Sequence, residues 1–220
     1  MRVLVVSAHA DDETLGCGGT LIKHRASGDE IHWLLVTSPQ RPLFDERFIA
    51  RRTAQIDAVA EAYGMASVKV AGLPAAGLDT MPLADVIALV GDAIAANAPD
   101  RIYVVHRDDV HTDHRVVFDA VWAASKPFNA ARAVDIYAYE TISSTNLAAP
   151  GAGVPFIATA YCDVCAQFDR KLDILRLYDT ELKPAPHPRS LEAVEALARY
   201  RGSAVGTSHA EAFVVVRASW

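Results

Sequence analysis

Along the first 126 residues, short uninterrupted apolar runs alternate with longer segments in which apolar residues recur every three or four positions. The short runs are typical of buried parallel strands, and the longer segments are typical of amphipathic helices. This pattern predicts strands at 3–8, 31–37, 67–70 and 101–105, helices at 14–27, 45–63 and 80–97, and a further helix that ends near 125. The β-α order predicts a three-layer α/β/α domain with a mainly parallel, Rossmann-like sheet.

The regular alternation fades after residue 126. Strands are predicted at 134–139, 156–161 and 213–217 and helices at 163–181 and 190–201, with Thr80 and Ser190 as expected helix N-caps. The segment 140–155 is rich in Ser, Thr, Gly and Pro and is long enough to line a binding site. We therefore expect one domain over 1–220, with a Rossmann-like half at about 1–126 and substrate-site elements at about 127–220.

Composition and charge exclude several classes of function. With 51% hydrophobic residues, the 220-residue chain has enough apolar material for a substantial core. Its formal charge of −6 disfavours binding to nucleic acid, which needs a basic face. No segment resembles a secretory signal or a membrane span of ~18 apolar residues. The three cysteines, Cys17, Cys162 and Cys165, form no disulfide framework, so we expect a reducing, cytoplasmic location.

Ionisable residues gather where two of the predicted strands end. The first strand runs into the sequence HADDE (residues 9–13), and the fourth is soon followed by HTDH (residues 111–114). Open α/β sheets bind ligands at the carboxyl edge of their strands, so both clusters should lie at one edge. Each cluster alone also fits a solvated loop whose carboxylate caps the next helix. Two imidazoles and a carboxylate can also bind zinc and leave a position for water, as in a catalytic site.

The two clusters and a late HAEAF (residues 209–213) resemble the motifs of the PIG-L/LmbE family of zinc-dependent de-N-acetylases. The most common first motif of that family is HPDDE, and this chain has Ala10 in place of the proline. The resemblance spans residues 3–213. It implies a hydrolase that removes an N-acetyl group from a small amino-sugar substrate of the GlcNAc type. It also allows a homo-oligomer, which the sequence itself does not show.

The resemblance implies specific roles for the first motif and for the end of the second. His9, Asp12 and His114 would bind the metal, which we expect to be Zn²⁺, although Fe²⁺ and Co²⁺ accept the same ligands. Asp11 would be the general base that takes a proton from the attacking water. This role is chemically reasonable because a carboxylate beside a cation stays ionised.

The same resemblance assigns roles to residues further along the chain. His111 would stabilise the oxyanion as an imidazolium or protonate the leaving amine, and Asp113 would hold the imidazoles of the second motif. Arg52 and His209 would contribute to the substrate-binding pocket. Arg189, in the segment 187–190, is either a ligand for a phosphate or carboxylate of the substrate or a surface arginine at a helix cap.

Three other functions remain open. A metal-dependent amidase acting on a larger amide, a thiol conjugate or a longer acyl chain would use the same catalytic residues in a pocket of a different size. A metal-dependent phosphohydrolase usually has its His-Asp pair in the order HD, whereas this chain has Asp113 before His114. A catalytically silent sugar- or metal-binding protein needs no base, so the presence of Asp11 favours an enzyme.

Overall fold

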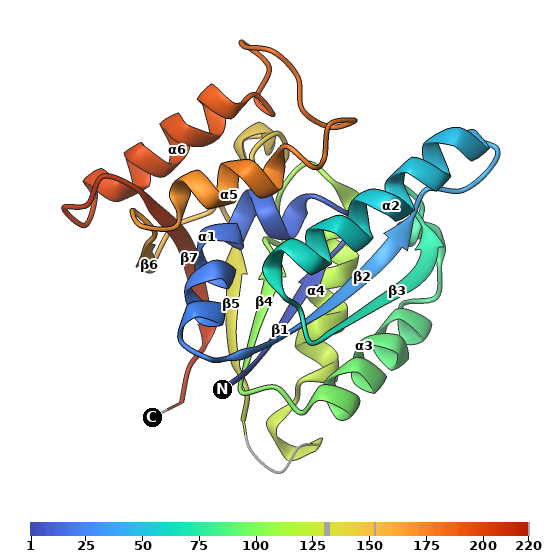
Figure 1. Cartoon of the computed structure of the whole chain (residues 1–220). Helices are drawn as coiled ribbons and strands as arrows, with labels where there is room; N and C mark the ends of the chain where they lie inside the picture. The colour runs from blue at the N-terminus through green and yellow to red at the C-terminus, as the bar shows by residue number, and fades with distance from the viewer. Residues whose placement is uncertain (130–132, 152, 220) are drawn as a thin grey trace.

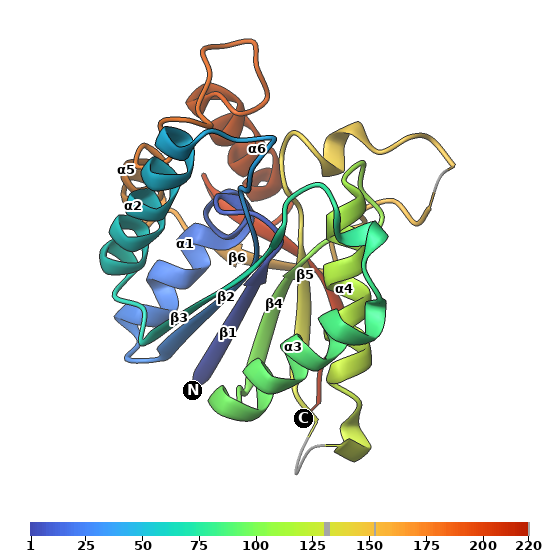
Figure 2. The same cartoon turned by 90° about the vertical axis from the view of Figure 1, so that its right-hand side faces the viewer.

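The computed structural model describes residues 1–129, 133–151 and 153–219, and within them a seven-stranded sheet lies between two layers of helices (Figures 1 and 2). The strands are β1 (Arg2–Ser7), β2 (Glu30–Ser38), β3 (Ser67–Pro74), β4 (Arg101–Val105), β5 (Asp135–Tyr139), β6 (Ala160–Asp163) and β7 (Ala210–Arg217). The helices are α1 (Asp12–Ala26), α2 (Glu46–Tyr63), α3 (Leu83–Asn97), α4 (Thr112–Ala124), α5 (Phe168–Leu175) and α6 (Leu191–Ser203). Three 3₁₀ turns are η1 (Leu78–Thr80), η2 (Pro127–Asn129) and η3 (Thr145–Leu147).

The strand order is β3-β2-β1-β4-β5-β7-β6. The first five strands in this order are parallel, and β7 runs antiparallel to both of its neighbours. The predicted three-layer, mainly parallel architecture is therefore confirmed. The chain proceeds outward from β1 through β2 to β3 and then returns to place β4 on the other side of β1. The carboxyl ends of β1 and β4 thus flank a topological switch point, where open α/β sheets bind their ligands.

Helices cover both faces of the sheet, as Figure 2 shows with the sheet seen nearly edge-on. The helices α1, α2, α5 and α6 lie on one face, and α3 and α4 lie on the other. Four consecutive residues of β1, Val3 to Val6, are almost fully buried, as the continuous apolar run predicts for a central parallel strand. The expected division of the chain near residue 126 stays a prediction.

Several boundaries differ from the sequence-based expectations, and polar contacts explain the largest differences. Thr80 does not cap α3, because its hydroxyl donates to the Gly77 carbonyl within η1 and Pro82 occupies the N-cap position. Ser190 does cap α6 by accepting the Ala193 N–H. The strand expected at 156–161 lies instead at β6, and β3 continues to Pro74.

The helix expected over 163–181 is wrong in length, since only α5 is helical there. Residues 178–181 leave the helix to contact buried partners: the Tyr178 hydroxyl donates to Glu13, and Thr180 and Glu181 accept from Arg52. The apolar residues at helical spacing on this segment nonetheless face the core: Phe168, Leu175 and Tyr178 are each at most 3% exposed, and Leu172 is half-buried.

The Glu211 side chain of the late HAEAF motif anchors α1. This helix has a non-helical residue at Cys17, so the N–H groups after the kink lack helical acceptors. The Glu211 carboxylate accepts from Gly19 N at 2.8 Å and from Thr20 N at 2.7 Å, and it forms a buried ion pair with Lys171 at 2.7 Å. Glu211 therefore supports the helix that carries the first motif.

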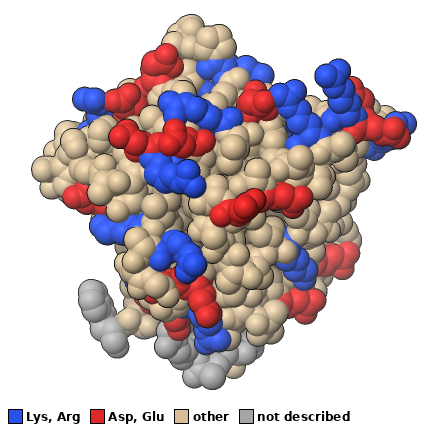
Figure 3. All heavy atoms as spheres, viewed as in Figure 1, with Lys and Arg blue, Asp and Glu red and all other residues tan. Residues whose placement is uncertain are grey.

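The molecular surface carries charges of both signs. Figure 3 shows basic and acidic side chains interspersed over the face that is viewed in Figure 1. Among the described residues, no helix combines the length and the apolar character that a membrane crossing requires. Cys17, Cys162 and Cys165 are free thiols.

Candidate active site and metal centre

The first motif forms a tight, strained loop between β1 and α1. Asp11 has φ = 129°, a conformation that L-residues rarely adopt. Several hydrogen bonds hold this loop: Asp12 accepts the His9 N–H at 2.7 Å, and Arg52 donates to the Ala10 carbonyl at 2.8 Å. Such strain persists only where the surroundings determine it, and it is common at functional sites.

The second motif begins α4 and depends on an aspartate two residues before it. Asp109 accepts the His111 N–H at 2.8 Å through one oxygen and contacts His114 Nδ1 at 2.6 Å through the other. His111 caps the helix, since its Nδ1 accepts the Asp113 N–H at 3.2 Å. Sequence reasoning missed Asp109, although its place in the same ionisable run (HRDDVHTDH) was a usable signal.

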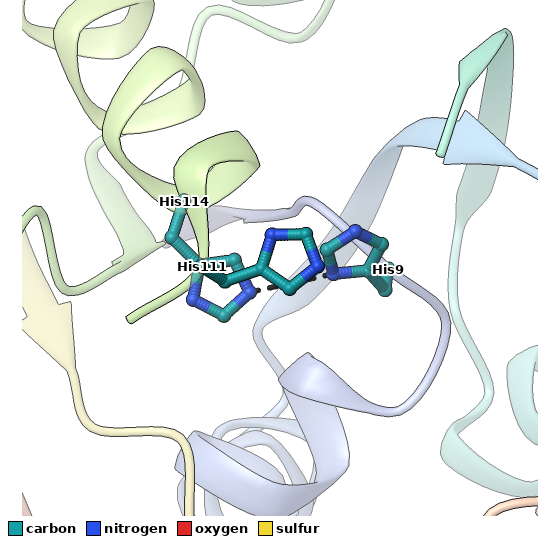
Figure 4. A group of neighbouring side chains, drawn as sticks. All are labelled: His9, His111 and His114. Carbon is teal, nitrogen blue, oxygen red and sulfur yellow. Dashed lines mark hydrogen bonds between the residues drawn. The ribbon is translucent and has the colours of Figure 1, made fainter. Parts of the chain in front are cut away.

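Three donor atoms from the two motifs face one another. His9 Nδ1 lies 3.3 Å from His114 Nε2, and Asp12 Oδ2 lies 3.5 Å from each of these nitrogens. Ligand atoms ~2.05 Å from a tetrahedral zinc ion are separated by roughly 3.3 Å, so the triangle matches one face of such a site. Figure 4 shows His9, after β1, and His111 and His114, at the start of α4, turned toward one another.

Outer carboxylates orient the two imidazoles. His9 Nε2 is 2.9 Å from Asp113, and His114 Nδ1 is 2.6 Å from Asp109, so each ring has its remaining nitrogen directed at the triangle. A carboxylate behind a ligating histidine is the usual arrangement at metal sites. Asp113 was expected to hold the imidazoles of the second motif, and this is wrong. Its carboxylate reaches His9 of the first motif because it also accepts the N–H groups of Ala76 and Leu78 across the sheet edge.

His111 lies beside the triangle, and its ligand atom is within 4.8 Å of those of His9 and His114. Its Nδ1 already accepts a backbone N–H, so the neutral ring carries its proton on Nε2. Burial, together with the nearby His9 and His114, lowers the pKa of His111 to about 4. The ring is therefore a neutral hydrogen-bond donor at physiological pH, and Asp12 completes the donor triangle better than His111 does.

The electrostatics of the triangle favour positive charge. Burial alone would lower the pKa of His9, but hydrogen bonds to Asp113 and Asp12 outweigh it and raise the pKa to about 9. Burial is likewise outweighed at His114, where the Asp12 charge and the hydrogen bond to Asp109 raise the pKa to about 10. Three carboxylates around two imidazoles thus create a field suited to a divalent cation.

Asp11 is close to the triangle but is not part of it. Burial raises the pKa of Asp11 to about 7, against the opposing charge of Arg189, whose Nη1 lies 3.2 Å from Asp11 Oδ2. That oxygen is buried and accepts no hydrogen bond from the described residues. A carboxylate oxygen with a free lone pair beside a candidate metal centre is well placed to accept a proton.

A cavity of about 220 Å³ opens over these groups. The C-terminal part of the chain contributes three polar lining residues, which are Ser144, Glu181 and Arg189. The apolar lining residues are Leu35, Pro39, Phe44, Phe48, Ile56, Ala75 and Ala76, and the polar residues Thr37, Ser38 and Arg52 also line the cavity. Within the segment 140–155, which was expected to line the site, only Ser144 does so among the described residues.

The structure separates the three expected substrate-binding residues. Arg52 and Arg189 line the cavity, and both donate to Glu181. His209 does not line it: its ring stacks on Phe168 with centroids 4.2 Å apart, at the start of β7. The motif position was misleading because β4 and β5 separate β7 from β1 in the sheet, and there Glu211 contacts α1 while His209 stacks on Phe168 of α5. Glu181 was missed because it lies outside any motif.

The fold and the cavity together are those of a Rossmann-like α/β protein with a candidate metal centre at its switch point. The chain belongs to the PIG-L family, whose model, described as GlcNAc-PI de-N-acetylase, matches residues 4–125. Most of the ionisable residues described above lie within the matched residues. No curated protein sequence matches the chain significantly.

Solved structures share the fold at low sequence identity. The conserved protein TT1542 from Thermus thermophilus has a TM-score of 0.79 and 23% identity, covering 99% of this chain and 96% of that one. N,N'-diacetylchitobiose deacetylase from Pyrococcus horikoshii has a TM-score of 0.77 and 17% identity, and the match covers 98% of this chain and 83% of that one. GalB, the 4-carboxy-2-hydroxymuconate hydratase from Pseudomonas putida, has a TM-score of 0.77 and 16% identity, and the match covers 100% of this chain and 97% of that one. At these identities the likeness shows the fold alone, and the reaction must be argued from the site.

Proposed function

We propose that the protein is a metal-dependent hydrolase that removes an N-acetyl group from a GlcNAc-like amino sugar. The observation that carries this proposal is the triangle of His9 Nδ1, His114 Nε2 and Asp12 Oδ2 beside the Asp11 oxygen that accepts no hydrogen bond. The family membership and the deacetylase among the structural neighbours support the same reaction. The expected cytoplasmic location and homo-oligomer stay predictions.

His9, Asp12 and His114 would hold the metal, with Zn²⁺ the first choice and Fe²⁺ or Co²⁺ compatible with the same donors. When bound, such an ion lowers the pKa of water and polarises an acyl oxygen. Asp113 and Asp109 keep the two imidazoles oriented through the bonds to His9 Nε2 and His114 Nδ1. These outer carboxylates therefore act on the reaction only through the imidazoles.

Asp11 acts as the general base and then as the acid. Its Oδ2 accepts a proton from the water whose oxygen bonds to the acyl carbon. A cation beside the carboxylate lowers its pKa from the value of about 7 in the metal-free protein, so Asp11 is ionised at neutral pH. The same proton then passes to the nitrogen as the C–N bond breaks, which yields acetate and the free amine.

His111 stabilises the negative charge that develops on the acyl oxygen. Its Nδ1 is occupied by the Asp113 N–H, so Nε2–H is the group that can donate. The lowered pKa favours a neutral donor over the imidazolium that the sequence suggested as one option. The sugar would lie against Glu181, Arg189 and Ser144, whose polar groups can exchange hydrogen bonds with hydroxyls.

Two measurements test this function. Amine release is measured from N-acetylglucosamine, its glycosides and UDP-N-acetylglucosamine, before chelation, after chelation and after zinc is restored. We expect metal-dependent release from at least one of these compounds. The Asp11→Asn variant should then lose about 10²–10⁴-fold in kcat while binding the same amount of metal. Unchanged activity in this variant would show that Asp11 is not the base.

A further inference from the structure

We propose that the amino-sugar substrate carries an anionic substituent, a phosphate or a carboxylate, which binds in a second cavity beside the candidate metal centre. This inference rests on the proposed hydrolysis and defines its substrate class more closely. The second cavity has a volume of about 290 Å³. Glu181 and Arg189 line both cavities, and the consecutive residues Ser143 and Ser144 line one each, so the two cavities adjoin.

A short loop before α6 provides three polar side chains of the second cavity, which belong to Lys183, His187 and Arg189. The loop is closed by hydrogen bonds from Lys183 N to the Arg189 carbonyl at 3.4 Å and from His187 N to the Pro184 carbonyl at 3.1 Å. Ser190, the next residue in the chain, caps α6. These contacts hold the three side chains on one loop that is attached to the helix.

Lys183 and His187 both present hydrogen-bond donors. Lys183 Nζ donates to the Thr180 carbonyl at 3.0 Å and pairs with no carboxylate of the described residues, so two of its three N–H groups stay available. His187 Nδ1 accepts the Arg189 N–H at 3.0 Å. The neutral His187 ring therefore carries its proton on Nε2, where it is a donor.

Arg189 has part of its guanidinium occupied and part available. Its Nε donates to the Ser143 hydroxyl at 2.8 Å, and its Nη1 contacts Glu181 and Asp11. Its Nη2 donates to none of the residues that the structure describes. The side chain is 27% exposed, so a substrate group can reach it.

The charges around the second cavity favour an anion. Glu181 is the one carboxylate among its described lining residues, and the two Glu181 oxygens accept from Arg52 and Arg189 respectively. Lys183 and Arg189 therefore leave the lining net positive, although the whole chain has a formal charge of −6. A local excess of positive charge in an acidic protein attracts anions to that place.

The donors and the charge together select the substituent. A phosphate or a carboxylate has several acceptor oxygens and forms charge-assisted hydrogen bonds with ammonium and guanidinium groups. A neutral hydroxyl would leave the positive charge without compensation. Since the sugar is proposed to lie against Glu181 and Arg189, a substituent that extends past these two residues enters the second cavity.

The test compares four compounds with the metal-loaded full chain: the neutral methyl glycoside of N-acetylglucosamine, its 1-phosphate, its 6-phosphate and its glycoside with glycolic acid. At least one anionic compound should exceed the methyl glycoside about tenfold or more in kcat/KM. The difference should lie mainly in KM, because the anion binds away from the acyl carbon. It should shrink as NaCl is raised from about 20 to 500 mM, since salt screens partly exposed charges.

A charge variant assigns the effect to the loop. Lys183→Gln should reduce the anionic-to-neutral ratio of kcat/KM about two- to fivefold. The matched control is Lys69→Gln, at an exposed lysine of β3 that lines neither cavity, and it should leave this ratio unchanged. Calorimetric binding of the same compounds to the chelated chain is the second readout, and it excludes binding of the phosphate by the metal itself.

The outcomes separate this inference from the proposed function. Hydrolysis of the methyl glycoside as fast as that of every anionic compound would overturn the inference and leave the deacetylase intact. An anionic preference that Lys183→Gln changes no more than Lys69→Gln does would also overturn it. No hydrolysis of any compound would instead overturn the proposed function, and the binding measurement would still decide whether the second cavity takes an anion.

Discussion

The N-terminal and C-terminal parts of the chain contribute to the site in different ways. The first part provides the candidate metal donors and the base within two short motifs, each at the end of a parallel strand. The later part provides Glu181 and Arg189 at single positions on irregular segments, and Glu211 at the start of β7. The chemistry is thus local in sequence, whereas the cavity wall and the support of α1 depend on long-range contacts.

This difference separates two ways in which a functional residue is positioned, by residues near it in the sequence or by tertiary packing. A motif at the end of a strand is positioned by residues close to it in the sequence, because they determine its backbone conformation and the cap of the following helix. A residue such as Glu211 acts across 192 positions on Gly19, and only the packing of β7 beside the other strands brings the two together. Substitutions in the later part should therefore affect stability first, and substitutions in the motifs should affect metal binding and catalysis first.

The largest expected effect is on the support of α1. Glu211→Gln leaves the Lys171 ammonium buried without its charged partner, so the free energy of unfolding should fall by about 3–5 kcal/mol. Urea denaturation measures this change. The matched control is Glu195→Gln, which removes an exposed pair with Arg199 and should cost less than about 1 kcal/mol. Equal effects of the two variants would contradict a supporting role for Glu211.

The next effect concerns pH. In the metal-free protein the pKa values of His9 and His114 are raised to about 9 and about 10, above the unfolded value near 6.5. Their stabilisation is therefore complete below pH ~6.5 and is lost as pH rises through 9 and 10. Denaturation of the chelated protein at several pH values measures this loss. Zinc affinity should rise over the same range, because protons compete for both nitrogens. Chelated protein whose stability rose from pH 7 to 10 would contradict the charge balance inferred here.

A smaller effect is expected from the carboxylate that sequence reasoning missed. Asp109→Asn weakens the bond that orients His114, so metal affinity should fall about 10–100-fold, measured by competition with a zinc chelator. Asp108→Asn is the matched control, since Asp108 pairs with Arg107 instead, and its metal affinity should be unchanged. If both variants bound zinc like the parent, Asp109 would have no role in the site.

The smallest effect is expected at His209. Its ring stacks on Phe168 outside the cavity, so His209→Phe should preserve that contact and leave kcat/KM within about twofold of the parent. Steady-state kinetics with the best substrate from the panel measures it. A loss of about tenfold or more in kcat/KM would show that His209 contributes to the substrate site, which would contradict the distinction drawn between the two parts of the chain.

The sequence by itself determined the layered fold and the two motifs at the strand ends. Apolar runs as uniform as Val3 to Val6 are typical of a strand that is buried on both faces. His9, Asp12 and His114 are recognisable because each lies in a dense local cluster of ionisable residues. The sequence predicts these features because interactions between residues close in sequence determine them.

Only the tertiary structure decided which groups face one another. It paired Asp113 with His9 and Asp109 with His114, ended α5 early so that Tyr178 and Glu181 reach the site, and turned His209 away from the cavity. These outcomes depend on side-chain hydrogen bonds and packing between segments distant in sequence, and no periodicity along the chain encodes them.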